Sequence, residues 1–264
     1  MPRLTATELE QYRRDGWVVP GFRLPATEVN ALRAALDRII ADNPGIRPER
    51  LVNAHLADSA EGVRGSRVFF ELARHAAILD LVEQAIGPDI VLWGCQVFCK
   101  PGGDGMEVPW HQDGHYWPIR PLATCTAWVA IDESKPENGC MRVIPGSHRS
   151  QTLFPHLTEG RTDLILNQRA RDDVFDAATA ADVVLEPGEM SLHDIFMIHG
   201  SNPNRSPRRR AGVAIRYMPA TSHFDRALMP TTNNGYRIDF ARRPIWLLRG
   251  RDRTGRNDFT IGHR

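Results

Sequence analysis

The sequence predicts a single domain that is mostly β-structure with flanking α-helices, arranged as a jelly roll. Helical patterns are confined to the first part of the 264 residues, and short β-rich runs punctuated by Gly, Pro and Asn follow them. No long helices alternate with those runs, which argues against a doubly wound parallel sheet. The spacing of the short strands suggests a sandwich or barrel. Because the helices come first and the antiparallel strands follow, we expect a jelly roll flanked by helices.

The composition excludes several classes of partner. The formal net charge is +1, so no overall basic field attracts nucleic acid or an anionic membrane, and we expect a small-molecule partner. No apolar run reaches the length of a membrane span, and the first residues carry charges where a signal peptide needs an apolar core. We therefore expect a cytoplasmic protein without membrane insertion, and the sequence leaves the oligomeric state open.

The cysteine pattern predicts neither a disulfide set nor a zinc site. Cys95, Cys99, Cys125 and Cys140 have no CxxC spacing and lie in apolar, strand-like surroundings. Such positions favour reduced thiols in the core.

The helical part begins with a capping signal. Thr7 followed by Glu10 has the form of a capping box, which predicts a short helix ending near residues 15–16. The run 16–22 has the composition of a strand. Apolar residues at three- and four-residue intervals then predict an amphipathic helix over 26–43, and a further helix is expected over 70–86, before Gly87.

The second part of the chain predicts the strands. A polar connection over 44–66 and a polar insertion over 151–181 separate the regular elements. The domain, 1–264, is expected to comprise a helical part 5–88, a jelly-roll core 89–220 and an arginine-rich C-terminal extension 221–264. The β-rich runs are 89–100, 124–132, 140–147, 182–188, 189–201 and 212–219.

A metal-binding pattern opens within the core. His111 and Asp113 point to the same face if they lie on a strand, because side chains alternate with period two. That pair alone is weak evidence, and His223 with Asp225 is a second match that no later histidine and arginine support. A distant histidine would complete a two-histidine, one-carboxylate iron face, and His199 at the end of an apolar run is the natural candidate.

An arginine follows His199 at the spacing expected for a co-substrate contact. Arg210 lies eleven residues after His199 and opens a β-rich run. A guanidinium there can meet the far carboxylate of 2-oxoglutarate through a two-pronged contact. His193, six residues before His199, is an alternative ligand, but no arginine stands eleven residues after it, which favours a supporting or core role.

Three runs together carry a family resemblance. WHQDGHYWPIRP (110–121), AWVAIDESKPENGCMRVIPGSH (127–148) and SLHDIFMIHGSNPNRSPRRRAGVAIRY (191–217) closely resemble the phytanoyl-CoA dioxygenase family of non-haem iron oxygenases. The resemblance covers roughly residues 5–220. It implies a double-stranded β-helix of jelly-roll type. By this resemblance the iron ligands are His111, Asp113 and His199, Arg210 binds 2-oxoglutarate, and Trp128, Gln112, Gln96 and Ser201 are further co-substrate contacts.

The resemblance also implies the chemistry. Such enzymes use Fe(II), 2-oxoglutarate and O2, and they release succinate and CO2 while they oxidise a carbon of the substrate. Hydroxylation of an aliphatic carbon is the expected outcome, in a small metabolite or natural-product intermediate, an anionic one included. Relatives that halogenate replace the acid by a small residue, so Asp113 argues against halogenation. His115, Tyr116 and Trp117 are expected to face the substrate.

Specificity is expected in the loops 44–66 and 221–240. Arginines that could meet a phosphate or carboxylate of the substrate are Arg50, Arg64, Arg67, Arg120, Arg237 and Arg242. Two alternatives stay open. One is a cupin-like metal-binding protein without oxygenase activity, against which Arg210 argues. The other is a metal-dependent hydrolase or isomerase on a similar barrel, for which two histidines and one acid also suffice.

Overall fold

Four helices occupy the N-terminal part of the computed structural model, which describes residues 1–228, 231–233 and 236–261. They are α1 (Ala6–Asp15), α2 (Ala26–Asp42), α3 (Arg67–Ala73) and α4 (Ala76–Ile86). The capping box at the start of α1 is formed by Thr5 and Glu8, so the predicted pair, Thr7 and Glu10, was wrong by two residues. The predicted helix end is confirmed, because Gly16 caps α1 in the left-handed conformation.

The long helix predicted over 70–86 is two helices. The chain breaks at Arg74 and His75, and α3 already begins at Arg67, where the side chain of Ser66 accepts a hydrogen bond from the Val68 backbone N–H. A cap of this kind satisfies one of the otherwise unpaired amides at a helix start. The apolar periodicity runs through both helices because they bury the same side of the chain.

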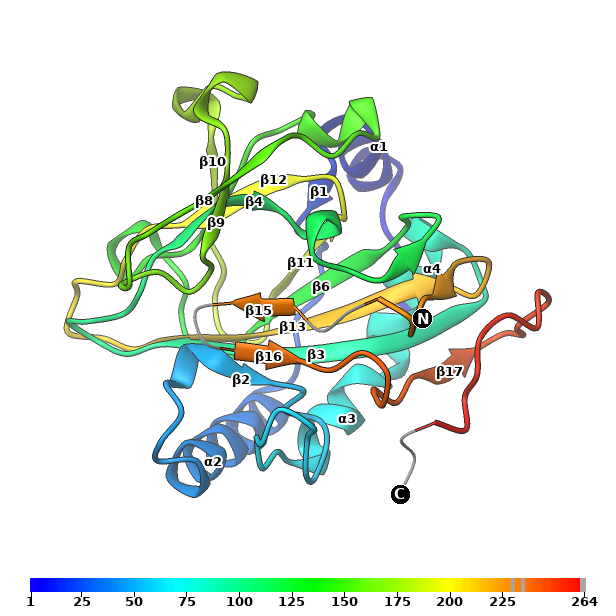
Figure 1. The fold of residues 1–264 in the computed structure, drawn as a ribbon, viewed down its shortest axis with the longest axis horizontal. Helices are drawn as coiled ribbons and strands as arrows, with labels where there is room; N and C mark the ends of the chain where they lie inside the picture. The colour runs from blue at the N-terminus through cyan, green and yellow to red at the C-terminus, as the bar shows by residue number, and fades with distance from the viewer. Residues whose placement is uncertain (229–230, 234–235, 262–264) are drawn as a thin grey trace.

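Two antiparallel sheets form the core of the fold (Figure 1), and the predicted jelly roll is confirmed. The larger sheet has the order β1-β11-β6-β13-β3-β17, with β2 also paired to β3, and the smaller has the order β10-β7-β12-β4. Strands of the larger sheet are β1 (Trp17–Val18), β2 (Leu51–Val52), β3 (Ile90–Lys100), β6 (Cys125–Ala130), β11 (Met190–Asp194), β13 (Arg210–Pro219) and β17 (Trp246–Arg249). Strands of the smaller sheet are β4 (Val108–Gln112), β7 (Met141–Val143), β10 (Ala181–Val183) and β12 (Ile198–Ser201).

Three further two-stranded antiparallel sheets are present among the described residues. They are β5 (Ile119–Arg120) with β14 (His223–Phe224), β8 (His156–Thr158) with β9 (Gln168–Ala170), and β15 (Thr231–Asn233) with β16 (Tyr236–Ile238). The β8–β9 pair lies within the polar insertion 151–181. No helix among the described residues is both long and apolar enough to cross a bilayer.

The helices cover one face of the larger sheet, and the site lies on the other. Alternate residues of β3, such as Cys95 and Val97, belong to the same buried cluster as Leu36 of α2 and Leu81 of α4. The intervening residues point the opposite way, toward the smaller sheet. All four cysteines are buried and unpaired, which confirms the predicted reduced core thiols.

The run 189–201 is two strands rather than the continuous strand expected. β11 belongs to the larger sheet and β12 to the smaller, and residues 195–197 form the turn between them. His193 and His199 therefore do not share one strand face, as their spacing had suggested. The chain crosses from one sheet to the other here, which brings both histidines to the space between the sheets.

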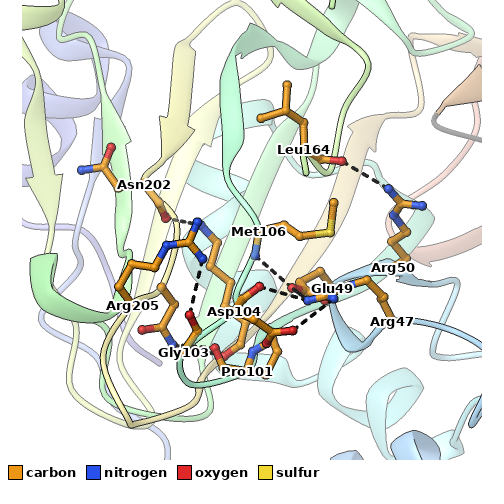
Figure 2. A network of polar contacts seen from close by, with 12 residues as sticks. Arg47, Glu49, Arg50, Pro101, Gly103, Asp104, Met106, Leu164, Asn202 and Arg205 are labelled. Carbon is orange, nitrogen blue, oxygen red and sulfur yellow. Dashed lines mark hydrogen bonds and ion pairs between the residues drawn. The ribbon is translucent and has the colours of Figure 1, made fainter. Parts of the chain in front are cut away.

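The segment 44–66 is fastened to the barrel. The fully buried Glu49 accepts hydrogen bonds from Arg47 and from the Met106 backbone N–H, and Arg47 also pairs with Asp104 at 3.3 Å. Figure 2 shows this network joining the segment to the loop at 101–106. The C-terminal extension is attached as well, through β17 and through an ion pair between Arg243 and Glu61 at 2.8 Å.

Candidate active site

Two histidines face each other on neighbouring strands of the smaller sheet. His111 of β4 is the register partner of His199 of β12. Each ring uses Nδ1 to bond a carbonyl two residues earlier, that of Pro109 at 2.9 Å and that of Met197 at 3.1 Å. A carbonyl only accepts, so Nδ1 carries the hydrogen and both Nε2 atoms keep a free lone pair.

Asp113 completes the group from outside the strand. β4 ends at Gln112, and Asp113 begins a 3-10 turn, so the strand alternation expected for the pair does not hold. The turn nevertheless directs the carboxylate inward, with Oδ1 3.5 Å from His111 Nε2 and 4.0 Å from His199 Nε2. The ligand atoms of these three buried residues lie within 4.8 Å of one another, as a shared metal ion requires.

The protonation states suit a cation. Burial by itself would raise the pKa of Asp113, but His199, His111 and His193 outweigh it and hold that pKa well below its usual value. Burial lowers the pKa of His199 to about 3, with the nearby His111 acting in the same direction. The site therefore offers a carboxylate and a neutral imidazole, the forms that bind metals.

His193 approaches the same carboxylate from the larger sheet. Its Nε2 lies 3.8 Å from Oδ2 of Asp113, and its Nδ1 is buried without a hydrogen-bond partner in the described part of the chain. It is not a member of the three-residue ligand group. This position suits a residue that supports the ligand carboxylate.

Arg210 stands at another part of the same cavity as a buried cation. Its Nη2 donates to the Gly139 carbonyl at 2.6 Å, its Nε lacks a partner among the described residues, and its guanidinium lies 5.4 Å from the Trp128 ring. Burial lowers its pKa to about 10. A buried guanidinium with an unused donor and, in the described part of the chain, no ion pair is suited to a carboxylate ligand.

Sequence reasoning missed a second buried cation beside it. Lys100 is the register partner of Arg210 and is fully buried. Its Nζ donates to Oγ of Ser201 at 2.6 Å and to the carbonyls of Ser201 and Asn202 at 3.3 and 2.5 Å. The alternation on β3 could have revealed it, because an even number of residues separates Lys100 from Gln96.

Trp128 and Gln96 lie where the resemblance implied, along the cavity wall, as does Ser201. The Trp128 ring lies over Gly212, where a Cβ would come within 2.1 Å of a ring atom. Gly212 is the register partner of Ala130 on β6, two residues beyond Trp128, and its missing Cβ leaves the room that the indole fills.

Gln112 and His115 are not brought to the cavity. The Gln112 amide bonds the carbonyls of Thr152 and Phe196 at 3.0 and 2.8 Å and accepts from the Phe154 N–H. Because Gln112 lies between two inward-facing residues, its side chain points to the other side and anchors the insertion.

Of the three residues expected to face the substrate, His115, Tyr116 and Trp117, the last two line the cavity and the first does not. His115 is exposed, bonds Gln168 and stacks on His156, with ring centroids 4.2 Å apart. Tyr116 and Trp117 line the cavity as expected. Burial raises the pKa of Tyr116 above its ordinary value, so its hydroxyl stays protonated near neutral pH.

The cavity arginines differ from those expected. Arg50 lines the cavity, whereas Arg64, Arg67, Arg120 and Arg242 are exposed elsewhere, and the Arg237 side chain lies outside the described residues. Arg216 and Arg243 line it instead. Arg216 follows Arg210 on β13 by an even number of residues, a signal that could have identified it. Ile238 and Phe240 add contacts from the expected loop 221–240.

Comparisons with known proteins agree with this geometry. The profile of the family described as Phytanoyl-CoA dioxygenase (PhyH) matches residues 12–212. Ectoine dioxygenase of Sphingopyxis alaskensis is 25% identical over 242 residues, which cover 84% of this chain and 78% of that protein. The apo structure of the non-haem monooxygenase ThoJ has a TM-score of 0.73 and 26% identity, covering 94% of this chain and 85% of that one. The structure of the epimerase SnoN with Fe3+, alpha-ketoglutarate and nogalamycin RO has a TM-score of 0.67 and 25% identity, covering 83% and 84%.

Proposed function

Since the chain belongs to the phytanoyl-CoA dioxygenase family, we propose that it is an Fe(II)- and 2-oxoglutarate-dependent dioxygenase that hydroxylates an aliphatic carbon of a small molecule. The substrate would be a metabolite or natural-product intermediate, and the products would include succinate and CO2. One observation carries the proposal. The His111, Asp113 and His199 group opens into the same cavity as Arg210, a buried guanidinium without a carboxylate partner among the described residues.

The residues present fit an iron ion. Two imidazole nitrogens and one carboxylate oxygen are the donor set of the two-histidine, one-carboxylate face, which leaves positions open for other ligands. Both histidines are oriented before any ion arrives, because their Nδ1–H groups bond backbone carbonyls. Iron(II) bound there supplies the activation of O2 that, with oxidative decarboxylation of 2-oxoglutarate, oxidises a C–H bond.

The chain's own residues would position the co-substrate and keep water out. Arg210 would bind the far carboxylate of 2-oxoglutarate, and Ser201 would donate its hydroxyl hydrogen, since its oxygen already accepts from Lys100. Trp128 would cover that contact, which strengthens it by lowering the local dielectric constant. Tyr116 and Trp117 would form the wall against which the substrate lies.

Hydroxylation is favoured over halogenation by Asp113. A carboxylate that occupies a ligand position leaves no place on that face of the iron for a halide. The same oxidant can also desaturate, epoxidise or close rings, so the outcome has to be read from the product. A cytoplasmic location remains our expectation.

An anaerobic titration tests the proposal. Iron(II)-loaded protein titrated with 2-oxoglutarate should develop the weak visible charge-transfer band of the chelated keto acid. Arg210→Ala should bind iron normally but require at least tenfold more 2-oxoglutarate, because it loses a charge-assisted contact. Arg67→Ala, a change at an exposed arginine, serves as the control.

The two alternatives give different results. If the protein were a metal-binding protein without turnover, a hydrolase or an isomerase, the folded, iron-loaded form would show no charge-transfer band with 2-oxoglutarate. Changing Arg210 would then cause no loss of 2-oxoglutarate affinity. Succinate release that depends on added candidate substrates would then be absent as well.

A further inference from the structure

Arg216 is a cation in the cavity wall with donors to spare. Its Nη2 donates to Oε1 of Gln96 at 3.0 Å, and its Nε is buried without a partner in the described part of the chain. Among the described residues no carboxylate oxygen lies within 4 Å of the Arg216 guanidinium, and Asp113, which acts on it from farther away, has three histidines within 4 Å. Arg243 differs, because it is paired with the buried Glu61 at 2.8 Å.

Unpaired polar atoms continue from Arg216 across the sheet. Thr126 is the register partner of both Arg216 on β13 and His193 on β11, and all three line the cavity. Within the described residues, Arg216 Nε, Thr126 Oγ1 and His193 Nδ1 are each buried without a hydrogen bond. Buried polar atoms left unsatisfied cost free energy, so this row is suited to a polar ligand.

Two indole rings fix the direction in which Arg216 points. Its guanidinium carbon lies 5.0 Å from the Trp117 ring and 5.6 Å from the Trp93 ring, and the two rings meet edge to face with centroids 4.5 Å apart. The flat guanidinium is therefore held against aromatic faces. A desolvated, oriented guanidinium prefers a planar, two-oxygen partner such as a carboxylate.

Arg216 and Arg210 serve different halves of the cavity. Arg210 stacks on Trp128, whereas Arg216 stacks on Trp93 and Trp117. The two positions are six residues apart on β13, which corresponds to about 20 Å between their Cα atoms in an extended strand. A carboxylate of 2-oxoglutarate bound at Arg210 therefore leaves the unpaired Nε–H of Arg216 free for another ligand.

We infer that Arg216 and Thr126, the two members of this row with a hydrogen-bond donor to spare, bind an oxyanion of the substrate, and that this oxyanion is a carboxylate, so that the substrate class is small organic anions. The inference rests on the proposed function only for which molecule is oxidised. His193 also contacts Asp113, so an anion bound in this row lies next to the metal-binding group. Carbons adjacent to the bound anion would then be the ones presented for oxidation.

Binding of matched probes tests the inference without turnover. Hexanoate and hexanamide have the same alkyl chain and differ in charge, and hexyl phosphate offers the alternative oxyanion. Each is titrated into metal-free protein and followed by ligand-observed NMR. Wild type should bind hexanoate at least tenfold more tightly than hexanamide, and Arg216→Met should remove that preference. A tighter affinity for hexyl phosphate than for hexanoate would identify a phosphate as the natural anion.

Two further variants separate the sites. Arg67→Met, at an exposed arginine, should change nothing, and Arg210→Met should keep the preference for hexanoate over hexanamide. If Arg216→Met does not fold, Thr126→Val, which removes a hydroxyl without changing shape, should weaken hexanoate binding severalfold. In calorimetry with a divalent metal present, Arg216→Met should bind 2-oxoglutarate with the affinity of wild type. If wild type itself does not bind 2-oxoglutarate, that result counts against the proposed function and not against the anion site.

Three results would overturn the inference. The first is that wild type binds hexanoate and hexanamide with equal affinity. The second is that wild type binds neither hexanoate nor hexyl phosphate. The third is that folded Arg216→Met keeps the wild-type preference for hexanoate over hexanamide.

Discussion

The Nζ of Lys100 donates a hydrogen bond to Oγ of Ser201 across 2.6 Å, inside a fully buried environment. Burial lowers the pKa of Lys100 well below its usual value, and the neighbouring Arg210 acts in the same direction. Three hydrogen-bond acceptors stabilise the ammonium, and an anion near Arg210 would add to this. Lys100 thereby supports Ser201, which would contact the proposed co-substrate, without lining the cavity itself.

Lys100→Met is therefore predicted to weaken 2-oxoglutarate binding by tenfold or more, measured by calorimetry. The change removes one of two buried positive charges near the expected carboxylate and frees Ser201 to turn its hydroxyl away. Ser201→Ala should give a smaller loss, because the charges remain. An unchanged affinity in a folded Lys100→Met protein would show that the lysine has a purely structural role.

The metal-binding group and its neighbour should respond differently to substitution. Asp113→Ala and His199→Ala are expected to abolish stoichiometric iron(II) binding in anaerobic equilibrium dialysis. His193→Asn should retain binding with an affinity about 10- to 100-fold lower, as for residues that support a ligand. If His193→Asn lost iron as completely as His199→Ala, then His193 would itself be a ligand.

Gly212 is predicted to be intolerant of a methyl group. A Cβ at this position would overlap the Trp128 ring, so Gly212→Ala should lower the free energy of unfolding by about 1–3 kcal/mol, as overpacked cores do. Gly94→Ala is a matched control in the adjacent strand, because its Cβ would lie 3.6 Å from Arg216 Cδ, an ordinary contact. Denaturant unfolding of both variants measures the difference, and equal losses would contradict the prediction.

A buried histidine outside the metal-binding group, His55, should make the protein acid-sensitive. His55 packs against Trp246 with ring centroids 5.1 Å apart, and neither ring nitrogen has a hydrogen-bond partner among the described residues. Burial, followed by the charge of Arg243, lowers its pKa from the ordinary value of 6.5 to about 3. The unfolded chain thus takes up a proton below pH 6.5 that the folded protein takes up only near pH 3.

The free energy of unfolding should therefore fall as the pH drops from about 6.5 toward 3, by at most about 1.4 kcal/mol per pH unit from this group. His55→Phe should flatten that slope in urea unfolding measured between pH 6.5 and 4. His115→Gln, at an exposed histidine, should leave it unchanged. A slope in His55→Phe equal to that of wild type would contradict the assignment.

Local signals in the sequence predicted much of the fold. The helix α2 follows from apolar residues at helical spacing, and the strands β3, β6 and β13 from β-rich runs between Gly and Pro. The single helix expected over 70–86 and the single strand expected over 189–201 were wrong. In both places the hydrophobic pattern is continuous, and a local pattern does not reveal where the chain turns to pack against a second layer.

The site residues also fall into those that the sequence predicted and those that it did not. Spacing and resemblance predict His111, Asp113, His199 and Arg210 as site residues, and their convergence in one cavity supports that assignment. Lys100 and Arg216 were overlooked because an isolated cation in a strand normally implies an exposed face. Whether it instead lies inside depends on which sheet face the helices cover.

By itself the sequence determined the fold class, the metal-binding motif and the family, because each depends on residues close together in the chain or at characteristic spacing. Tertiary structure alone decided that His193 approaches Asp113 from the opposite sheet, that Gln112 faces away from the cavity and that Arg216 faces into it. The physical reason is that these relationships arise from pairing and packing of strands distant in sequence. Register across β11, β6 and β13, rather than any local propensity, aligns the polar row beside the metal-binding group.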